Sequence, residues 1–327
     1  MVRYTLAIFF LLILLAAAAP ADEPVMKLVQ TIPLEGVEGR MDHFGIDPER
    51  NRLYLAALGN NTLELIDLAA GKRIKSIKGL KKPTVIRVLP GSGKVVVASG
   101  DDGKVRVYDA DLNLLGSVDG LDDADNVRLD AEGKLAFVGY GDGALAVIDP
   151  ERLKKVGEVK LDGHPEALQL EQHGPRIFVN VPTARHVAVV DREKLAVIAK
   201  WPLNEFEANF PLALDEANHR LFVGCRKPAK LVVLDTESGK AMASIDCCGD
   251  TEDLFYVPAS NRIYITGGEG CITVVEQTSP DHYRVQGQVR TAPGARTSLY
   301  YGDALYVGVP HRARQPSEVR EYRSARR

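Results

Sequence analysis

Short runs of apolar residues recur along the chain at a nearly constant spacing. Most copies begin with Arg or Lys followed by about four apolar residues, as in 52–56. A second apolar run follows in these copies and ends in an acid. The closing acids lie 40 to 44 residues apart and are Asp67, Asp109, Asp149, Asp191, Asp235 and Glu276. A seventh copy covers 304–322. Self-similarity at this period indicates one repeated supersecondary unit rather than several unrelated domains.

Each copy is predicted to form four short β-strands. An apolar segment such as 44–47 precedes the strand that begins with Arg or Lys, and turn residues such as 47–51 separate the two. The third strand ends at the closing acid, and a fourth follows another turn, as at 74–77. Four-stranded units of 40 to 45 residues are typical of β-propellers. We therefore predict an all-β chain that forms a seven-bladed β-propeller with four-stranded blades, as a single domain over residues 22–327.

The two ends of the repeat array predict how the ring closes. The seventh copy ends after its third strand, and an additional apolar strand at 27–33 precedes the first copy. If this N-terminal strand is the fourth strand of the last blade, the ring closes without a free sheet edge. An open solenoid, the alternative, leaves that strand without a partner.

The repeats resemble the YVTN-type, or YncE-like, β-propeller family. The resemblance rests on the Arg-Leu-Tyr-Leu-Ala, Val-Ile-Asp and Gly-Lys patterns at 52–56, 147–149 and 71–72, and it covers about residues 25–322. The Gly-His and Trp-Asp signatures of WD40 repeats do not recur in the copies. The resemblance implies an exported seven-bladed propeller like those of bacterial surface and periplasmic proteins. The same superfamily fold is found in subunits of quinoprotein amine dehydrogenases and in nitrous-oxide reductase, so it implies no single activity.

The first 21 residues have the pattern of a signal peptide. Arg3 precedes an apolar run over 6–19, and Ala19-Pro20-Ala21 fits the small-x-small cleavage pattern. The run is shorter than the roughly twenty residues that cross a bilayer, although an uncleaved N-terminal anchor is the alternative. We expect residues 1–21 to be removed and the protein to be periplasmic or secreted, with no later membrane-spanning segment.

Composition and charge narrow the class of partner. Apolar residues make up 45% of the chain and charged residues 26%, as in ordinary globular proteins. The net charge of -3 argues against a nucleic-acid partner, because binding to a phosphate backbone needs a dense basic face. We expect a monomer that binds a protein or a small molecule.

Polar residues concentrate in the segments that lead into the first strand of each blade. Aligned on that strand, four blades carry a carboxylate at one position: Asp42, Asp125, Glu166 and Asp253. Their polar neighbours are Arg40, His43, Asn126, Arg128, His164, Asn209, Asp250 and Arg296, and His311 lies in a loop of blade seven. Because the first strand is innermost, these residues are predicted to meet at one mouth of the central channel and to bind a ligand there.

Carboxylates that lie so close together need positive charge nearby. One source is internal: Arg40, Arg87, Arg128 and Arg296. The other is a divalent metal, for which the candidate ligands are Asp42, His43, His164 and Glu166; oxygens suit Ca²⁺ or Mg²⁺, and added imidazoles suit a transition metal. No other cofactor is expected. A purely structural role is the further alternative, in which the carboxylates accept backbone N–H bonds from neighbouring loops.

Four cysteines lie in blades five and six. Export would place them in an oxidising compartment, where paired thiols tend to form disulfides. Cys225 and the Cys247-Cys248 pair are both expected at the channel face, so we predict a disulfide from Cys225 to Cys247 or Cys248; Cys271 starts a strand on the same side. A soft-metal site of two or three thiolates near 226–228 is the alternative.

The function predicted from the sequence is a binding or scaffold role at the channel mouth. The sequence contains no nucleophile elbow, no His-Glu-x-x-His zinc motif and no haem-attaching Cys-x-x-Cys-His, which disfavours an enzyme. One alternative is a metal-assisted periplasmic lyase or hydrolase that uses the carboxylates and histidines of the mouth. A second is an accessory subunit of a periplasmic redox complex, which rests on analogy with the superfamily alone.

Overall fold

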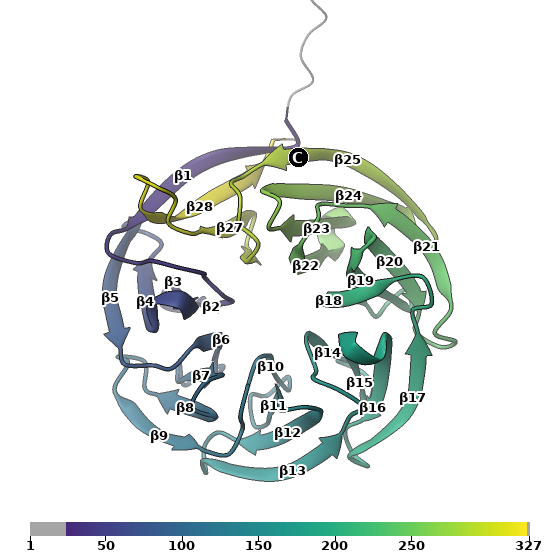
Figure 1. Cartoon of the computed structure of the whole chain (residues 1–327), viewed down its shortest axis with the longest axis horizontal. Helices are drawn as coiled ribbons and strands as arrows, with labels where there is room; N and C mark the ends of the chain where they lie inside the picture. The colour runs from purple at the N-terminus through teal and green to yellow at the C-terminus, as the bar shows by residue number, and fades with distance from the viewer. Residues whose placement is uncertain (1–23, 326–327) are drawn as a thin grey trace, which may run out of the picture.

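Seven antiparallel sheets of four strands form a closed ring around a central channel (Figure 1). The computed structural model describes residues 24–325, so the predicted signal peptide at 1–21 lies outside the described residues. Within the described residues there is no α-helix, and none of their elements is a helix long and apolar enough to cross a membrane. The predicted all-β, seven-bladed β-propeller with four-stranded blades is confirmed.

The strands of each blade follow one another from the channel outwards. Blades one to three contain β2 (Phe44–Asp47), β3 (Arg52–Ala57), β4 (Thr62–Asp67) and β5 (Lys72–Lys78); β6 (Pro83–Val88), β7 (Val95–Ser99), β8 (Lys104–Tyr108) and β9 (Leu114–Val118); β10 (Val127–Leu129), β11 (Ala136–Tyr140), β12 (Ala144–Asp149) and β13 (Lys154–Lys160). Blades four and five contain β14 (Leu168–Leu170), β15 (Arg176–Val181), β16 (His186–Asp191) and β17 (Ala196–Pro202); β18 (Glu207–Asp215), β19 (Arg220–Lys227), β20 (Ala229–Asp235) and β21 (Ala241–Asp246).

Blades six and seven complete the ring. They contain β22 (Thr251–Val257), β23 (Arg262–Gly267), β24 (Cys271–Ser279) and β25 (His282–Arg290); β26 (Ser298–Tyr301), β27 (Ala304–Val309), β28 (Ser317–Ser324) and β1 (Met26–Leu34). Three short 3-10 turns, η1 (Leu58–Asn60), η2 (Pro182–Ala184) and η3 (Pro258–Ser260), lie between strands. As predicted, the strand nearest the N-terminus closes the last blade, where β1 pairs antiparallel with β28 from Met26↔Ser324 to Leu34↔Ser317.

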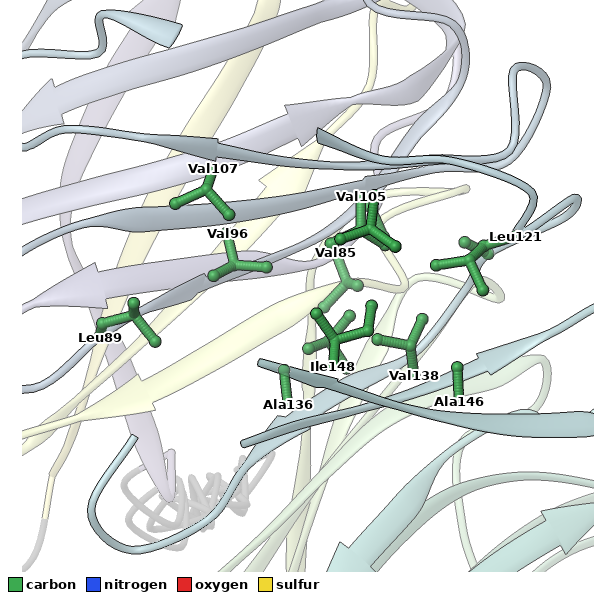
Figure 2. Close-up of a cluster of buried hydrophobic side chains, with 14 residues drawn as sticks. Val85, Leu89, Val96, Val105, Val107, Leu121, Ala136, Val138, Ala146 and Ile148 are labelled. Carbon is green, nitrogen blue, oxygen red and sulfur yellow. The ribbon is translucent and has the colours of Figure 1, made fainter. Parts of the chain in front are cut away.

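The core lies between neighbouring blades. Successive residues of a strand point to opposite faces of the sheet, and both faces are covered in a propeller, so the middle strands are apolar on both faces. Figure 2 shows the cluster between blades two and three, in which Val96 of β7 and Val105 of β8 lie opposite Ala136 and Val138 of β11. All of these side chains are buried.

The repeated closing acids stabilise turns. Asp109 accepts backbone N–H bonds from Asp111 and Asn113, and Asp235 accepts them from Glu237 and Ser238. Such side-chain bonds to the following backbone are typical of Asx turns. The most regular acids of the sequence therefore belong to the scaffold and not to the channel mouth.

The disulfide differs from the sequence prediction. It joins Cys248 to Cys271, whose Cα atoms lie 5.8 Å apart, while Cys225 and Cys247 are free and buried. The side chain of Cys225 lies in the core between blades four and five, whereas Cys247 packs between blades five and six. The predicted pairing of Cys225 with Cys247 or Cys248 is wrong, because Cys248 is bonded to Cys271 and the side chains of Cys225 and Cys247 belong to different core clusters.

Candidate functional site

The loops between second and third strands support the segments that lead into the innermost strands. The backbone N–H of Gly59 donates to the carbonyl of Arg40, and that of Gly141 donates to the carbonyl of Asp122. The N–H of Gly268 donates to Asp250 in the same way. These bonds hold polar residues of several blades at one mouth of the channel. Together they line a cavity of about 200 Å³ whose lining includes Arg40, Asp42, Lys82, Asp123, Asp125, His164, Glu166, Phe210, Arg226, Glu252 and Arg296.

Asp42 is a buried carboxylate, and one of its oxygens has no hydrogen-bond partner among the described residues. It is 1% exposed, and its Oδ2 lies 3.3 Å from Nη2 of Arg40. Its Oδ1 has no hydrogen-bond partner and lies 3.7 Å from Nε2 of His43. Burial is the main cause that raises the pKa of Asp42 to about 8, because it disfavours the charged form.

His43 is held by a second carboxylate. Its Nδ1 lies 3.1 Å from Oδ1 of Asp253, and Oδ2 of Asp253 accepts the backbone N–H of Ser298 at 2.7 Å. Burial alone would lower the pKa of His43, but the charge and hydrogen bond of Asp253, with Asp42 and Glu252 nearby, raise it to about 10. The imidazole is therefore a cation at neutral pH.

Glu252 and Arg226 are residues of the mouth that the sequence prediction did not include in the site. The Oε1 of Glu252 lies 3.4 Å from Nη2 of Arg40, and its other oxygen pairs with Arg226. The guanidinium of Arg226 also lies 3.5 Å from the ring centre of Phe210. A register shift in β22 separates Thr251 from Asp253, so Glu252 lines the mouth while Asp253 lines the channel. The bulge is not visible as a pattern in the sequence.

Asp125, His164 and Glu166 form a separate cluster at the mouth. The Nδ1–H of His164 donates to the carbonyl oxygen of Gly141 at 2.7 Å, which leaves Nε2 facing Oδ2 of Asp125 at 3.9 Å. Burial and the negative charge of Asp125 raise the pKa of Glu166 to about 8. The interaction of the imidazole with the carboxylate of Asp125 is the main cause that raises the pKa of His164 to about 9. Glu166 is thus held protonated near neutral pH beside an ionised Asp125.

The candidate metal ligands fall into two groups. Asp42 and His43 lie with Glu252, and His164 and Glu166 lie with Asp125; in each group the candidate ligand atoms are within 4.8 Å of one another. Arg40 already pairs with Asp42 and Glu252 in the first group. Neither carboxylate of the second group forms an ion pair with an Arg or Lys among residues 24–325.

The other residues that the sequence predicts for the site lie in several different places. Arg296 lies at the mouth and pairs with Asp250 at 3.0 Å. Asn126 is buried and accepts a bond from Nη1 of Arg128. Asn209 is buried between blades, where its amide donates to Asn180, and it does not line the mouth. His311 is exposed in the loop between β27 and β28 and lines neither the mouth nor the channel cavity.

Arg87 and Arg128 do not balance the charge of the carboxylates at the mouth, which was one of the possibilities inferred from the sequence. They line a deeper cavity of about 400 Å³ in the channel, together with His43 and Asp253. Within the described part of the chain, neither arginine forms an ion pair with a carboxylate. The guanidinium groups that pair with the acids of the mouth are those of Arg40, Arg226 and Arg296.

Two curated relatives share weak sequence similarity with the chain. Each is described as uncharacterized protein YncE, one from Salmonella typhi and one from Salmonella typhimurium, and each is 23% identical over 180 residues. The match covers 54% of this chain and 50% of the relative, so it spans only half of the relatives' length. No family model matches the chain, and the YVTN-type assignment therefore stays a resemblance.

Solved structures with very different sequences share the fold. A chain of Kuenenia stuttgartiensis hydrazine synthase superposes with a TM-score of 0.73 at 15% identity, covering 84% of this chain and 95% of that one. A chain of a mitotic checkpoint complex superposes with a TM-score of 0.76 at 13% identity, covering 96% and 98%. At these identities the likeness concerns the fold alone. The chain is a seven-bladed β-propeller with similarity to YncE.

Proposed function

We propose that this chain is an exported binding protein that holds a small ligand at the mouth of its channel, and that the ligand supplies positive charge as a divalent cation. The group of Asp125, His164 and Glu166 carries the proposal: its candidate ligand atoms lie within 4.8 Å of one another, and neither carboxylate pairs with an Arg or Lys among residues 24–325. Two carboxylates that lie so close together repel each other when both are ionised, and a cation between them would remove that repulsion. Burial, followed by the negative charge of Asp125, raises the pKa of Glu166, and a bound cation would oppose this shift by favouring the ionised form.

The group of Asp125, His164 and Glu166 fits a cation better than the group around Asp42. Within residues 24–325 no arginine pairs with its carboxylates, whereas Arg40 bridges Asp42 and Glu252. The bond from Nδ1–H of His164 to a backbone carbonyl leaves Nε2 as the nitrogen that would bind a metal once it loses its proton, as is usual for metal-binding histidines. One imidazole and two carboxylates favour Zn²⁺ or Mn²⁺ over Ca²⁺, which prefers oxygen ligands only.

Metal analysis of the purified protein tests this proposal. We expect about one equivalent of a divalent metal per chain, or uptake of one equivalent of Zn²⁺ or Mn²⁺ in a calorimetric titration. His164→Ala and Glu166→Ala should remove the uptake. His173→Ala is the matched control, because His173 is 86% exposed and lies away from the mouth.

Two results would contradict the cation site. One is a wild-type protein that contains no metal and takes up none of the titrated ions. The other is uptake that persists in both His164→Ala and Glu166→Ala, because the metal would then be bound elsewhere. Export is tested separately, by locating the mature protein and sequencing its N-terminus.

A metal-assisted lyase or hydrolase is the alternative, and one observation favours it. Glu166 has a pKa of about 8 and lies beside Asp125 and His164, so it could donate a proton near neutral pH. An enzyme of this kind would lose turnover in Glu166→Gln while keeping its metal. A binding protein would show no turnover in either form.

A further inference from the structure

Two arginines face the interior of the channel, below the mouth. Arg87 comes from β6 and Arg128 from β10, the innermost strands of neighbouring blades. Both line the cavity of about 400 Å³, whose other polar side chains include Gln169, Ser298 and Asp253. Two guanidinium groups in one partly enclosed cavity repel each other, so their positions need an explanation.

Only one nitrogen of each guanidinium is occupied. Nη1 of Arg87 donates to the carbonyls of Ile86 at 2.7 Å and Phe44 at 3.4 Å. Nη1 of Arg128 donates to Oδ1 of Asn126 at 2.8 Å and to the carbonyl of Val127 at 3.1 Å. No partner among the described residues is recorded for Nε or Nη2 of either arginine. The anchored Nη1 fixes each group, and the edge formed by Nε and Nη2 is the one that binds oxyanions in a two-pronged manner.

The cavity lacks the negative charge that would balance these arginines. Asp253 is the one carboxylate among its lining residues, and its two oxygens are already bound by His43 and by the backbone of Ser298. Burial, and for Arg87 the charge of Arg128, lower the pKa of both guanidinium groups, that of Arg128 to about 10. Arginine nevertheless stays protonated at neutral pH. Even with Asp253 counted, one positive charge of the two arginines is uncompensated.

We infer that the channel cavity binds a small oxyanion between Arg87 and Arg128. The free edges of the two guanidinium groups supply four N–H-bearing nitrogens, which suits a phosphate, a sulfate or a carboxylate. The anion would remove the repulsion between the arginines and satisfy their open donors. The free inorganic ion and a larger metabolite that carries the same group share this chemistry.

This site is distinct from the proposed cation site at the mouth. The cation ligands Asp125, His164 and Glu166 line the mouth cavity, and none of them lines the channel cavity. The anion site therefore does not depend on whether a metal binds. If one titration shows no binding, the proposal for the other site is unaffected.

Calorimetric titration of the purified mature protein at low ionic strength tests the anion site. The probes are inorganic phosphate, sulfate and succinate, with chloride at equal ionic strength as the reference. We expect saturable binding with one anion per chain. Phosphate or sulfate binding alone would identify a tetrahedral ion, and tighter binding of succinate would identify a carboxylate ligand.

Substitutions locate the binding. Arg87→Gln and Arg128→Gln should each weaken binding at least tenfold, because each removes a charge and a two-pronged donor. Arg87→Lys and Arg128→Lys should fall between these variants and the wild type, because lysine keeps the charge but loses the fork. Arg152→Gln is the matched control, because Arg152 is 79% exposed and pairs only with Asp149.

Thermal melting tests the anion site even if a glutamine variant does not fold. The wild type should melt several degrees higher in phosphate, sulfate or succinate than in chloride at the same ionic strength, since a ligand that binds only the folded state stabilises it. The lysine variants should lose most of this shift. The inference is overturned if the wild type shows neither saturable binding nor an anion-specific shift. It is also overturned if folded Arg87→Gln and Arg128→Gln bind as tightly as Arg152→Gln.

Discussion

The imidazole Nδ1 of His43 lies 3.1 Å from Oδ1 of Asp253, and this pair links the entrance of blade one to the innermost strand of blade six across the channel. The same carboxylate accepts the N–H of Ser298 in blade seven. Three blades thus meet at one side chain. Because a ring is stabilised by contacts between blades that are distant in sequence, this pair should influence the stability of the whole fold.

The first prediction concerns the pH dependence of stability. The pKa of His43 is about 10 in the folded protein and about 6.5 in an unfolded chain, so the folded state binds the proton more tightly. The contribution of His43 is fully present below pH 6.5 and is lost as the pH rises through about 10. Urea unfolding of the wild type and His43→Gln from about pH 6 to about pH 10 measures it: the stability advantage of the wild type should shrink across this range.

The pH dependence caused by His43 must be separated from that of two carboxyl groups of the mouth. Asp42 and Glu166 also have raised pKa values, and they too favour the folded state less as the pH rises, but between about pH 4 and about pH 8. Chelator in the buffer keeps any metal from changing these values. An advantage of the wild type over His43→Gln that stays constant with pH would show that Asp253 does not raise the pKa of His43.

The second prediction concerns Arg226. It lies against Phe210 and binds Glu252, a carboxylate that is 8% exposed. Arg226→Ala should lower the free energy of unfolding by about 3 kcal/mol, because the buried carboxylate of Glu252 then keeps only its 3.4 Å contact with Arg40. Arg185→Ala is the control: its pair with Glu207 is exposed on both sides and should contribute less than about 1 kcal/mol. Equal losses in the two variants, measured by urea unfolding, would refute the buried network.

The sequence predicts the ring well because the signals for the ring are local. Strands such as 52–57 and 62–67 are apolar on both faces, and turn residues separate them at a regular period. The register of the first strand likewise places Asp42, Asp125 and Glu166 together at the mouth, where the structure has them. Glu252 was missed, because a bulge in β22 changes which of two adjacent acids faces the mouth. A bulge depends on pairing with the next strand, which a single-strand pattern does not record.

The disulfide pairing also could not be predicted from the pattern of single strands. Their positions along the strands place all four near the channel face, but a disulfide needs Cβ atoms that point toward each other. Cys225 packs in the core between blades four and five, whereas Cys247 packs in the core between blades five and six. A shift of one residue in the strand register turns a side chain to the opposite face of the sheet. The nearness of two cysteines in the predicted fold therefore did not predict which of them are bonded.

The third prediction follows from the observed pairing. Alkylation of the unreduced, denatured protein should label two cysteines, Cys225 and Cys247, and mass spectrometry should recover a linked Cys248–Cys271 peptide. Four labelled cysteines would contradict the disulfide. Cys271→Ser should lower the free energy of unfolding by about 3 kcal/mol, since the bond closes a loop with a sequence separation of 23 residues. Cys225→Ser probes a buried free thiol and should leave the linked peptide intact.

The fourth prediction concerns ring closure by β1. Ile32 is fully buried and packs in the core between blades one and seven, whereas Leu28 on the same strand is 49% exposed. Ile32→Ala should lower the free energy of unfolding by about 3 kcal/mol, through lost burial and the cavity that remains. Leu28→Ala, which removes a side chain of the same size from the same strand, should change it by less than about 0.5 kcal/mol.

Urea unfolding separates closure by β1 from an accessory role of this strand. If β1 closes the ring, Ile32→Ala should shift a single cooperative transition of the whole propeller, because blades one and seven lose their common contact. If β1 only covers the surface of blade seven, Ile32→Ala should behave like Leu28→Ala and leave the transition where it is. The antiparallel pairing of Ile32 with Val319 of β28 and the burial of both side chains favour the first outcome.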